Sequence, residues 1–268
     1  MLRPPLALRT RIGFYSPPRT GPVARGHVLE QDPTMSDHPK ARTVLIAVAA
    51  PAEARAVLAG LGADVAAAES PWRLHAAAPG FDVVVTGIGK ANAAGAVGRL
   101  LDPQRHRAVV SMGVAGVLPG VADLGVGGTV VADACVFADE GVETGQEGEQ
   151  GFIDCAALGF PLGPSPVQGS RVPVAPDLVR ELREAVGECA VGSVATVSTC
   201  SGTDALAQRV RRRTGALAEA MEGAAVALVG ARVGVMAGEV RVISNTTGDR
   251  TRQVWELRRA LGVLERVA

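Results

Sequence analysis

Short apolar runs alternate with segments of helical character along most of the chain. Runs such as "TVLIAV" and "FDVVV" are rich in β-branched residues and too short for long helices, so they predict buried strands. The segments between them predict helices, and one opens with Pro51, where a first-turn proline is tolerated. The predicted strands span residues 42–50, 81–89, 107–116, 127–139, 191–200, 215–221 and 238–245. The predicted helices span residues 51–61, 90–101, 176–188, 202–213, 222–234 and 252–267.

This alternation of strands and helices predicts an α/β protein with a mainly parallel sheet. The chain has 268 residues, which suffices for one large domain or two small ones. Residues 141–171 are rich in Gly, Glu, Gln and Pro, and they predict a long excursion over the surface.

Residues 1–34 differ from the rest, because they are rich in proline and arginine and hold no acid before Glu30. They lack the apolar centre of about 7–15 residues that a secretory signal needs, although an Arg-rich transit peptide would look similar. We favour a disordered tail or a mispredicted start, because Met35 opens a natural N-terminus. The folded domain is then expected to span residues 35–268.

The composition excludes several classes of function. Formal net charge is zero, so there is no electrostatic footprint for nucleic acid or an anionic membrane. Apolar runs end well short of the roughly 20 residues that span a bilayer. The four cysteines form no CxxC pair and histidine is scarce, so we expect no metal site and a reduced, cytoplasmic protein.

Polar residues and glycines follow several of the predicted strands. In an open α/β sheet these positions gather at the carboxyl edge, where ligands bind. Glycines there let backbone N–H groups approach a ligand. The turn "TGIGKANAAG" invites a dinucleotide interpretation, but it lacks the third glycine and the acid about 20 residues further on. The polar and glycine-rich positions are Glu53, Gly87 in "TGIGK", Gly113 in "MGVAG", "STCSGT", Glu222 and Asn245.

The motifs "VVVTGIGKANAA", "VVSMGVAGVLPG", "ADLGVGGTVVAD", "AMEG" and "VRVISN" follow one another between residues 43 and 262. In this order they resemble the purine nucleoside phosphorylases and nucleosidases, and most of all the futalosine hydrolases of menaquinone biosynthesis. The resemblance implies a single domain with a central twisted mixed sheet flanked by helices, in a homo-oligomer such as a dimer or tetramer. It also implies hydrolysis of futalosine to hypoxanthine and dehypoxanthinyl futalosine, without a cofactor or a metal.

The same resemblance assigns roles to two acids. Glu222 matches the carboxylate that binds the ribose hydroxyls, with Met221 packing on the sugar, and Glu53 matches the acid that activates water. Carboxylates suit a sugar that becomes cation-like as its glycosidic bond breaks. The alternative for both acids is a favourable position in the first turn of a helix.

Asn245 matches the position that recognises the purine, where adenine-cleaving relatives carry Asp. Its alternative role is a turn residue at a strand end. Arg241 lies four residues earlier on the same predicted strand, so we expect the two side chains to share a face. Arg241 would orient the site or pair with an acid.

Further positions match the family's purine pocket. Ser201, Gly202 and Thr203 line it, although Ser or Thr there would also cap the helix that follows. Gly113 and Ala115 form its floor. Phe137 would stack on the base, with a core role as the alternative.

Arg250 and Arg252 follow Asn245 and could meet the aromatic carboxylate of futalosine, unless they are simply solvated. The competing functions are a purine nucleoside phosphorylase, a nucleosidase for another purine nucleoside such as methylthioadenosine, and an inactive nucleoside-binding protein. A phosphorylase needs several basic or hydroxyl groups near the sugar, and the glycine turns carry few.

Overall fold

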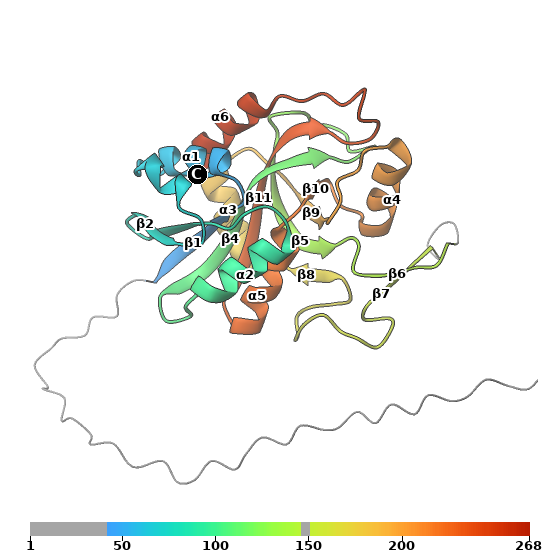
Figure 1. The fold of residues 1–268 in the computed structure, drawn as a ribbon, viewed down its shortest axis with the longest axis horizontal. Coiled ribbons are helices and arrows are strands. Elements are labelled where there is room, and N and C mark those ends of the chain that lie inside the picture. Colours follow the sequence, from blue (N-terminus) through green and yellow to red (C-terminus); the bar gives the residue numbers. More distant parts are fainter. Residues whose placement is uncertain (1–41, 146–150) are drawn as a thin grey trace, which may run out of the picture. The chain divides into compact units, whose positions relative to one another are not determined.

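Nine strands pair into one mixed sheet in the described part of the chain (Figure 1). The computed structural model describes residues 42–145 and 151–268, so the expectations about residues 1–34 and Met35 lie outside it. The strands are β1 Thr43–Val48, β2 Leu74–Ala78, β3 Phe81–Val85, β4 His106–Val117, β5 Thr129–Phe137, β6 Gly141–Glu143, β7 Phe152–Asp154, β8 Arg171–Pro173, β9 Ala190–Thr196, β10 Ala218–Ala220 and β11 Met236–Thr246. The helices are α1 Pro51–Gly60, α2 Lys90–Leu100, α3 Pro176–Val186, α4 Asp204–Thr214, α5 Gly223–Val233 and α6 Leu257–Val267, with a 3₁₀ turn at Val65–Glu69.

The strand order of the main sheet is β10-β9-β5-β11-β4-β1-β3-β2, and β8 pairs with β5. β10 also pairs with β4, so β4, β11, β5, β9 and β10 form a closed ring. β11 runs parallel to β4 on one side and antiparallel to β5 on the other. The mixed sheet flanked by helices is therefore confirmed, and β6 and β7 form a separate hairpin.

The helices cover both faces of the sheet. The chain passes from β1 through α1 to β3, and then back through α2 to β4 on the other side of β1. Since such crossovers are right-handed, α1 and α2 lie on opposite faces. α6 packs beside α1 and α5 packs beside α2, and Figure 1 shows these two pairs apart from each other.

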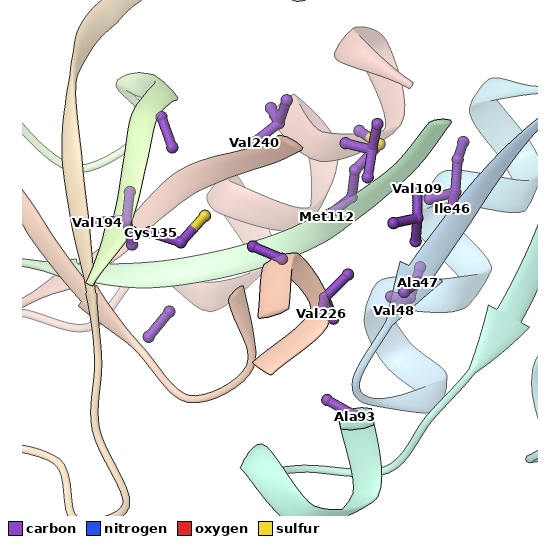
Figure 2. Packing of buried hydrophobic residues seen from close by; sticks show 14 of the residues in the cluster. Ile46, Ala47, Val48, Ala93, Val109, Met112, Cys135, Val194, Val226 and Val240 are labelled. Atoms are coloured by element: carbon purple, nitrogen blue, oxygen red, sulfur yellow. The ribbon is translucent and has the colours of Figure 1, made fainter. Parts of the chain in front are cut away.

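The core consists of small apolar side chains. Val226 of α5 and Ala93 of α2 pack near Val48 of β1 and Val109 of β4 (Figure 2). Alanine and valine let helices approach the sheet closely, which suits a chain with only 3% aromatic residues.

Most of the predicted elements are present, with two kinds of difference. The pattern missed β2, β6, β7 and β8, and residues 141–171 hold the β6–β7 hairpin and β8 rather than a plain excursion. The last helix begins at Leu257 instead of residue 252, because Trp255 forms an isolated antiparallel bridge with Asn245. No helix in the described ranges has the length and hydropathy to cross a membrane.

Asp82 lies near the amino-terminal end of β3, and its contacts join β3 to β1 and to the residue before β4. Its carboxylate accepts hydrogen bonds from Arg105 Nε at 2.8 Å, Arg105 Nη2 at 2.6 Å and Thr43 Oγ1 at 2.8 Å. Burial raises its pKa, but the hydrogen bonds from Arg105 and Thr43 outweigh burial and hold the pKa below the usual value.

Asp82→Asn should therefore lower the free energy of unfolding by about 2 kcal/mol at neutral pH, as loss of hydrogen bonds to a charged group does. A lowered folded-state pKa stabilises the fold above the unfolded pKa, and this contribution disappears as the pH falls through the folded value. Denaturant titrations at neutral pH and at about pH 2 should show the difference between the two proteins shrinking. An equal difference at both pH values would contradict this account.

Candidate active site

Glu53 lies at the carboxyl end of β1, in the first turn of α1, and is buried. Its Oε2 accepts a hydrogen bond from Ala50 N at 3.0 Å, as an acid in the first turn of a helix commonly does. Its Oε1 accepts a hydrogen bond from Val114 N on β4 at 2.8 Å, and this contact does not contribute to the start of the helix. The side chain therefore joins α1 to the centre of the sheet.

Glu222 lies directly before α5, yet its side chain does not cap that helix. Its Oε1 accepts from Gly89 N at 2.9 Å, and its Oε2 accepts from Arg241 Nη2 at 3.3 Å. Gly89 has φ of 91°, a conformation that favours glycine, so the turn after β3 is shaped to present its N–H to this carboxylate. The first-turn alternative for Glu222 does not account for these contacts.

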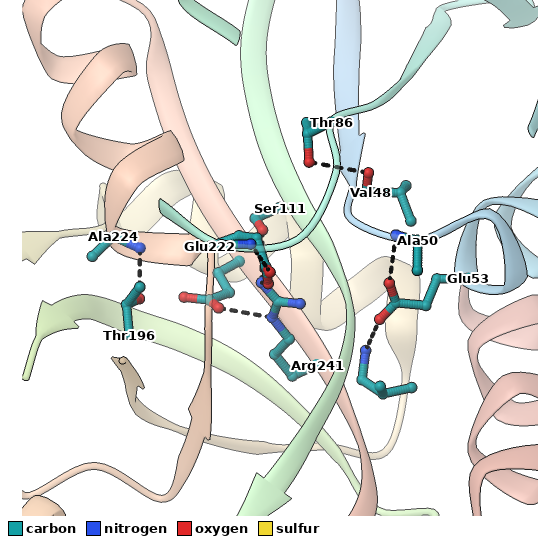
Figure 3. A network of polar contacts seen from close by, with 12 residues as sticks. Val48, Ala50, Glu53, Thr86, Ser111, Thr196, Glu222, Ala224 and Arg241 are labelled. Carbon is teal, nitrogen blue, oxygen red and sulfur yellow. Dashed lines mark hydrogen bonds and ion pairs between the residues drawn. The ribbon is translucent and has the colours of Figure 1, made fainter. Parts of the chain in front are cut away.

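Arg241 on β11 is 1% exposed and connects the acids (Figure 3). Its Nε donates to Glu239 Oε1 at 2.8 Å, and its Nη2 donates to Ser111 Oγ at 2.8 Å as well as to Glu222. Burial lowers its pKa, but the charges of Glu239, Glu222 and Glu53 more than reverse this and raise it. The guanidinium thus stays charged in a dry environment.

Gly113 of β4 lies between Glu53 and Arg241. A Cβ at this position would come within 2.5 Å of Glu53 Oε1 and 2.7 Å of Arg241 Nη1, so only glycine allows both groups here. Burial raises the pKa of Glu53, while Arg241 and the Val114 N–H lower it and Glu222 raises it further, with a net rise. A carboxylate with a raised pKa is a suitable general base for water.

Asn245 lies at the end of β11, beyond a register slip. Ile243 pairs with Ala115 and Asn245 pairs with Gly116, so Ser244 is an additional residue in β11. The expected shared face of Arg241 and Asn245 does not hold across this bulge. The carboxamide lies against Gly116 instead, where its Oδ1 accepts from Ser244 Oγ at 2.8 Å and its Nδ2 donates to Thr246 O at 2.9 Å.

The segment 201–203 is tied to the same end of the sheet. Ser201 N and Oγ donate to the buried Glu219 carboxylate at 2.7 and 2.6 Å. Thr203 is exposed and accepts from Leu206 N at 3.3 Å, so the helix-cap alternative is confirmed for Thr203. Gly202 O accepts from Arg250 N at 3.1 Å, which links this segment to the loop that follows Asn245.

Three other residues predicted for the pocket, Ala115, Gly87 and Met221, are near Val114, Gly89 and Glu222 in the sequence but make fewer polar contacts. Ala115 is buried and its carbonyl accepts from Ser244 Oγ at 3.3 Å. Gly87 begins the turn that contains Gly89 and has φ of 90°. Met221 is half-buried against a small apolar cluster.

Phe137 is buried at the end of β5, with Lys90 Nζ 5.7 Å from the centre of its ring. It belongs to the main core, and it also borders an open cavity of about 1290 Å³ beside α4 and the β6–β7 hairpin. That cavity is not lined by Glu53, Glu222 or Asn245. Stacking of Phe137 on a base therefore stays a prediction.

Three further polar residues lie in this region without having been predicted from the sequence, namely Ser111, Glu219 and Glu239. Glu239 carried a usable signal, since it is a lone acid two residues before Arg241 in a β-branched run and so shares its strand face. No group of histidine, cysteine or acidic residues in the described ranges is arranged to hold a metal ion.

Comparison with known proteins defines the family of this chain. Residues 81–268 match the model of the phosphorylase superfamily. The futalosine hydrolase of Acidothermus cellulolyticus is 40% identical over 223 residues, which cover 82% of this chain and 86% of that protein. The futalosine hydrolase of Streptomyces coelicolor is 38% identical over 228 residues, covering 82% and 91%. The chain belongs to the phosphorylase superfamily.

Within this superfamily it groups with the futalosine hydrolases. Solved structures of superfamily members share the fold. Helicobacter pylori futalosine hydrolase has a TM-score of 0.63 at 19% identity, covering 84% of this chain and 95% of its own. A 5′-methylthioadenosine nucleosidase mutant from the same organism has a TM-score of 0.64 at 19% identity, covering 84% and 96%. The resemblance inferred from the motifs is thereby confirmed.

Glu222→Gln should remove most of the activity of this superfamily member and leave the fold intact. The amide keeps the shape of the side chain but loses its charge, and loss of one preorganised electrostatic group costs on the order of 100-fold in kcat. Steady-state kinetics with a purine nucleoside and thermal melting would measure both effects. Turnover near that of the wild type would show that the Glu222 carboxylate has only a structural role, in its contacts with Gly89 N and Arg241.

Proposed function

We propose that this chain hydrolyses the N-glycosidic bond of futalosine and releases hypoxanthine and dehypoxanthinyl futalosine. The observation that carries the proposal is the buried arrangement of Glu53 beside Arg241 over Gly113 and of Arg241 bound to Glu222, in a chain that groups with the futalosine hydrolases. Futalosine hydrolysis places the enzyme in menaquinone biosynthesis, and the reaction requires neither a cofactor nor a metal.

The proposed binding of the sugar rests on the negative charge of Glu222. As the glycosidic bond breaks, the ribose becomes cation-like, and Glu222 stabilises it by accepting hydrogen bonds from the ribose hydroxyls. Arg241 and Gly89 N–H hold this carboxylate in place. Glu53 takes a proton from the attacking water, and its raised pKa makes it a stronger base than an exposed glutamate. The missing side chain at Gly113 leaves room for Glu53 and Arg241 to lie close together.

The base side requires a group that recognises the edge of a 6-oxopurine. The Asn245 carboxamide uses one N–H on Thr246 O and one oxygen lone pair on Ser244 Oγ. One N–H and one oxygen lone pair of the carboxamide are left to bind a purine. The N–H would donate to O6, and the oxygen would accept from N7 once that atom is protonated.

A phosphorylase is the main alternative, and the contacts of Lys90 and Thr86 disfavour it. Lys90 Nζ is bound to Asp139 Oδ1 at 2.5 Å and Glu140 Oε1 at 2.7 Å. Thr86 Oγ1 donates to Gly87 O at 2.8 Å. The two groups of the "TGIGK" turn that could bind phosphate are therefore engaged elsewhere. An inactive binding protein would have no need of two buried site carboxylates.

The deciding experiment incubates the purified protein with futalosine, inosine, adenosine and methylthioadenosine, with and without inorganic phosphate. We expect hypoxanthine from futalosine at a rate independent of phosphate. Formation of a sugar 1-phosphate would identify a phosphorylase, and faster release of adenine from methylthioadenosine would identify the other nucleosidase. Binding without turnover of any of the four would identify a binding protein.

Asn245→Asp should weaken hydrolysis of the hypoxanthine nucleoside and admit its adenine analogue. The 6-amino group of adenine presents a donor, which the N–H of Asn245 cannot pair with, whereas a carboxyl group can accept it. Sites built to pair polar groups reject the wrong partner by up to roughly 10⁴-fold. Competition between the two forms of one nucleoside measures this ratio, and equal rates in the wild type would refute the role of Asn245.

Two arginines near the site compete for the aromatic carboxylate at the far end of futalosine. Arg252 is engaged, since its Nη2 contacts Asp204 Oδ2 at 2.5 Å and its Nε contacts Asp249 Oδ2 at 3.0 Å. Arg250 makes no ion pair among the described residues, and its guanidinium lies 5.1 Å from the ring centre of Trp255. Trp255 is 50% exposed and its backbone pairs with Asn245. Arg250 has no acidic partner in the described ranges and lies beside a solvent-exposed aromatic ring, so it is a better candidate than Arg252 to bind an aromatic carboxylate.

Arg250→Ala should raise the KM for futalosine by about tenfold, the cost of one charge-assisted contact, and leave the KM for inosine unchanged. Arg252→Ala is the matched control, and its ratio of the two KM values should equal that of the wild type. If Arg250→Ala raises the KM for futalosine and the KM for inosine by the same factor, Arg250 does not bind the carboxylate of futalosine.

The assembly and location of the enzyme are also proposals. Family resemblance supports a homo-oligomer, a dimer or tetramer. The four cysteines are free thiols, which supports residence in the reducing cytoplasm.

A further inference from the structure

Glu239 is a buried acid that the proposed mechanism does not use. It is 0% exposed, on the central strand β11, and its Oε1 accepts from Arg241 Nε at 2.8 Å. Its Oε2 has no hydrogen-bond partner in the described part of the chain. The Cys135 thiol of β5 lies beside this carboxylate. A buried acid whose second oxygen meets no donor stronger than this thiol among the described residues is costly, so its presence calls for a physical reason.

We propose that Glu239 is a positioning residue that acts through Arg241 and through the start of α5 to set the arrangement of Glu222 and the environment of Glu53. The inference rests on the proposed function, because it assigns Glu239 to the same hydrolytic site.

The first link is the shape of the guanidinium. This group is planar and rigid, so fixing its Nε fixes the directions of both Nη atoms. Glu239 occupies the Nε side. Nη2 then meets Ser111 and Glu222, while Nη1 faces the space over Gly113 beside Glu53. Arg241 is 1% exposed, so bulk solvent does not reach its Nε in the folded protein and Glu239 is the partner that satisfies it.

The second link is the helix that follows Glu222. A Cβ at Gly223, the first residue of α5, would overlap the Glu239 carboxylate. The start of α5 therefore rests directly on Glu239, and Ala224 N is held by Thr196 Oγ1 at 2.8 Å. The positive end of the helix favours a negative charge at Glu239. Glu239 thus fixes the backbone that carries Glu222 as well as the guanidinium that binds it.

The third link is charge. The groups that face Glu53 are Arg241 of β11, Glu222 before α5, and the N–H groups of Val114 and Ala50. Those that face Glu239 are Arg241, Glu222 and Cys135. Glu239 neutralises part of the Arg241 charge that would otherwise stabilise the ionised form of Glu53. Removing the charge of Glu239 therefore lowers the pKa of Glu53.

Glu239→Gln tests this directly in the full-length protein, assayed on the purine nucleoside that the wild type hydrolyses fastest. We expect kcat to fall on the order of tenfold, as for other residues that hold a catalytic group in place, with little change in KM. The acidic limb of the pH profile of kcat/KM should move to lower pH, because Glu53 then loses its proton at lower pH. Glu239→Asp keeps the charge, so its acidic limb should stay at the wild-type position.

Asp82→Asn is the matched control, because Asp82 is also a buried carboxylate bound to an arginine but lies outside the site. It should lower the melting temperature without moving the pH profile. If Glu239→Gln behaves in the same way, or leaves kcat and the profile unchanged, Glu239 has only a structural role and the proposal is overturned.

Gly223→Ala provides a second test through a different residue. The added methyl group should displace the Glu239 carboxylate and lower kcat in the wild-type background. In a Glu239→Ala background the methyl group has space, so Gly223→Ala should lower kcat much less than it does in the wild-type background. If Gly223→Ala lowers kcat by the same factor in both backgrounds, the contact between α5 and Glu239 does not act on catalysis and this link is overturned. Since every comparison uses the best substrate, these results remain decisive even if futalosine is not that substrate.

Discussion

The buried guanidinium of Arg241 is the group on which the rest of this site depends. A permanent charge that is 1% exposed must be compensated by nearby acids and hydroxyls. Here the compensation comes from three directions: Glu239 on the same strand, Ser111 on β4, and Glu222 before α5. These groups come from two neighbouring strands and from the start of α5, so β4, β11 and α5 must be in place before the charge is balanced. Fold and site therefore form together.

Glycine makes this concentration of charge possible. Gly113 brings Glu53 and Arg241 together, Gly89 presents an N–H to Glu222, and Gly223 leaves space for Glu239. Each position would be blocked or strained by a side chain. Alanine and valine do the same for the core, where they let α2 and α5 approach the sheet. The abundance of small residues is thus a condition for the dense packing of polar groups around one cation.

The sequence predicts much of this arrangement, because strand ends of an α/β sheet converge and motif order identifies the family. Glu53, Glu222 and Arg241 were predicted on these grounds, and the structure brings them together. The relation of Asn245 to Arg241 could not be predicted, because one additional residue, Ser244, changes the strand alternation. Glu239 was overlooked because an acid inside a β-branched run has no motif of its own. The short strands β6, β7 and β8 lack the apolar runs that mark the longer ones, since their pairing comes from tertiary context.

The central claim is that three carboxylates around one guanidinium leave negative charge facing the sugar. It is tested most directly by the affinity of the wild-type protein for two hypoxanthine nucleoside analogues of equal shape. One carries a positive charge in the ring that replaces ribose, and the other is neutral. The account predicts that the charged analogue binds on the order of 100-fold more tightly, as a mimic of the transition state does. Equal affinity for the two analogues would contradict it.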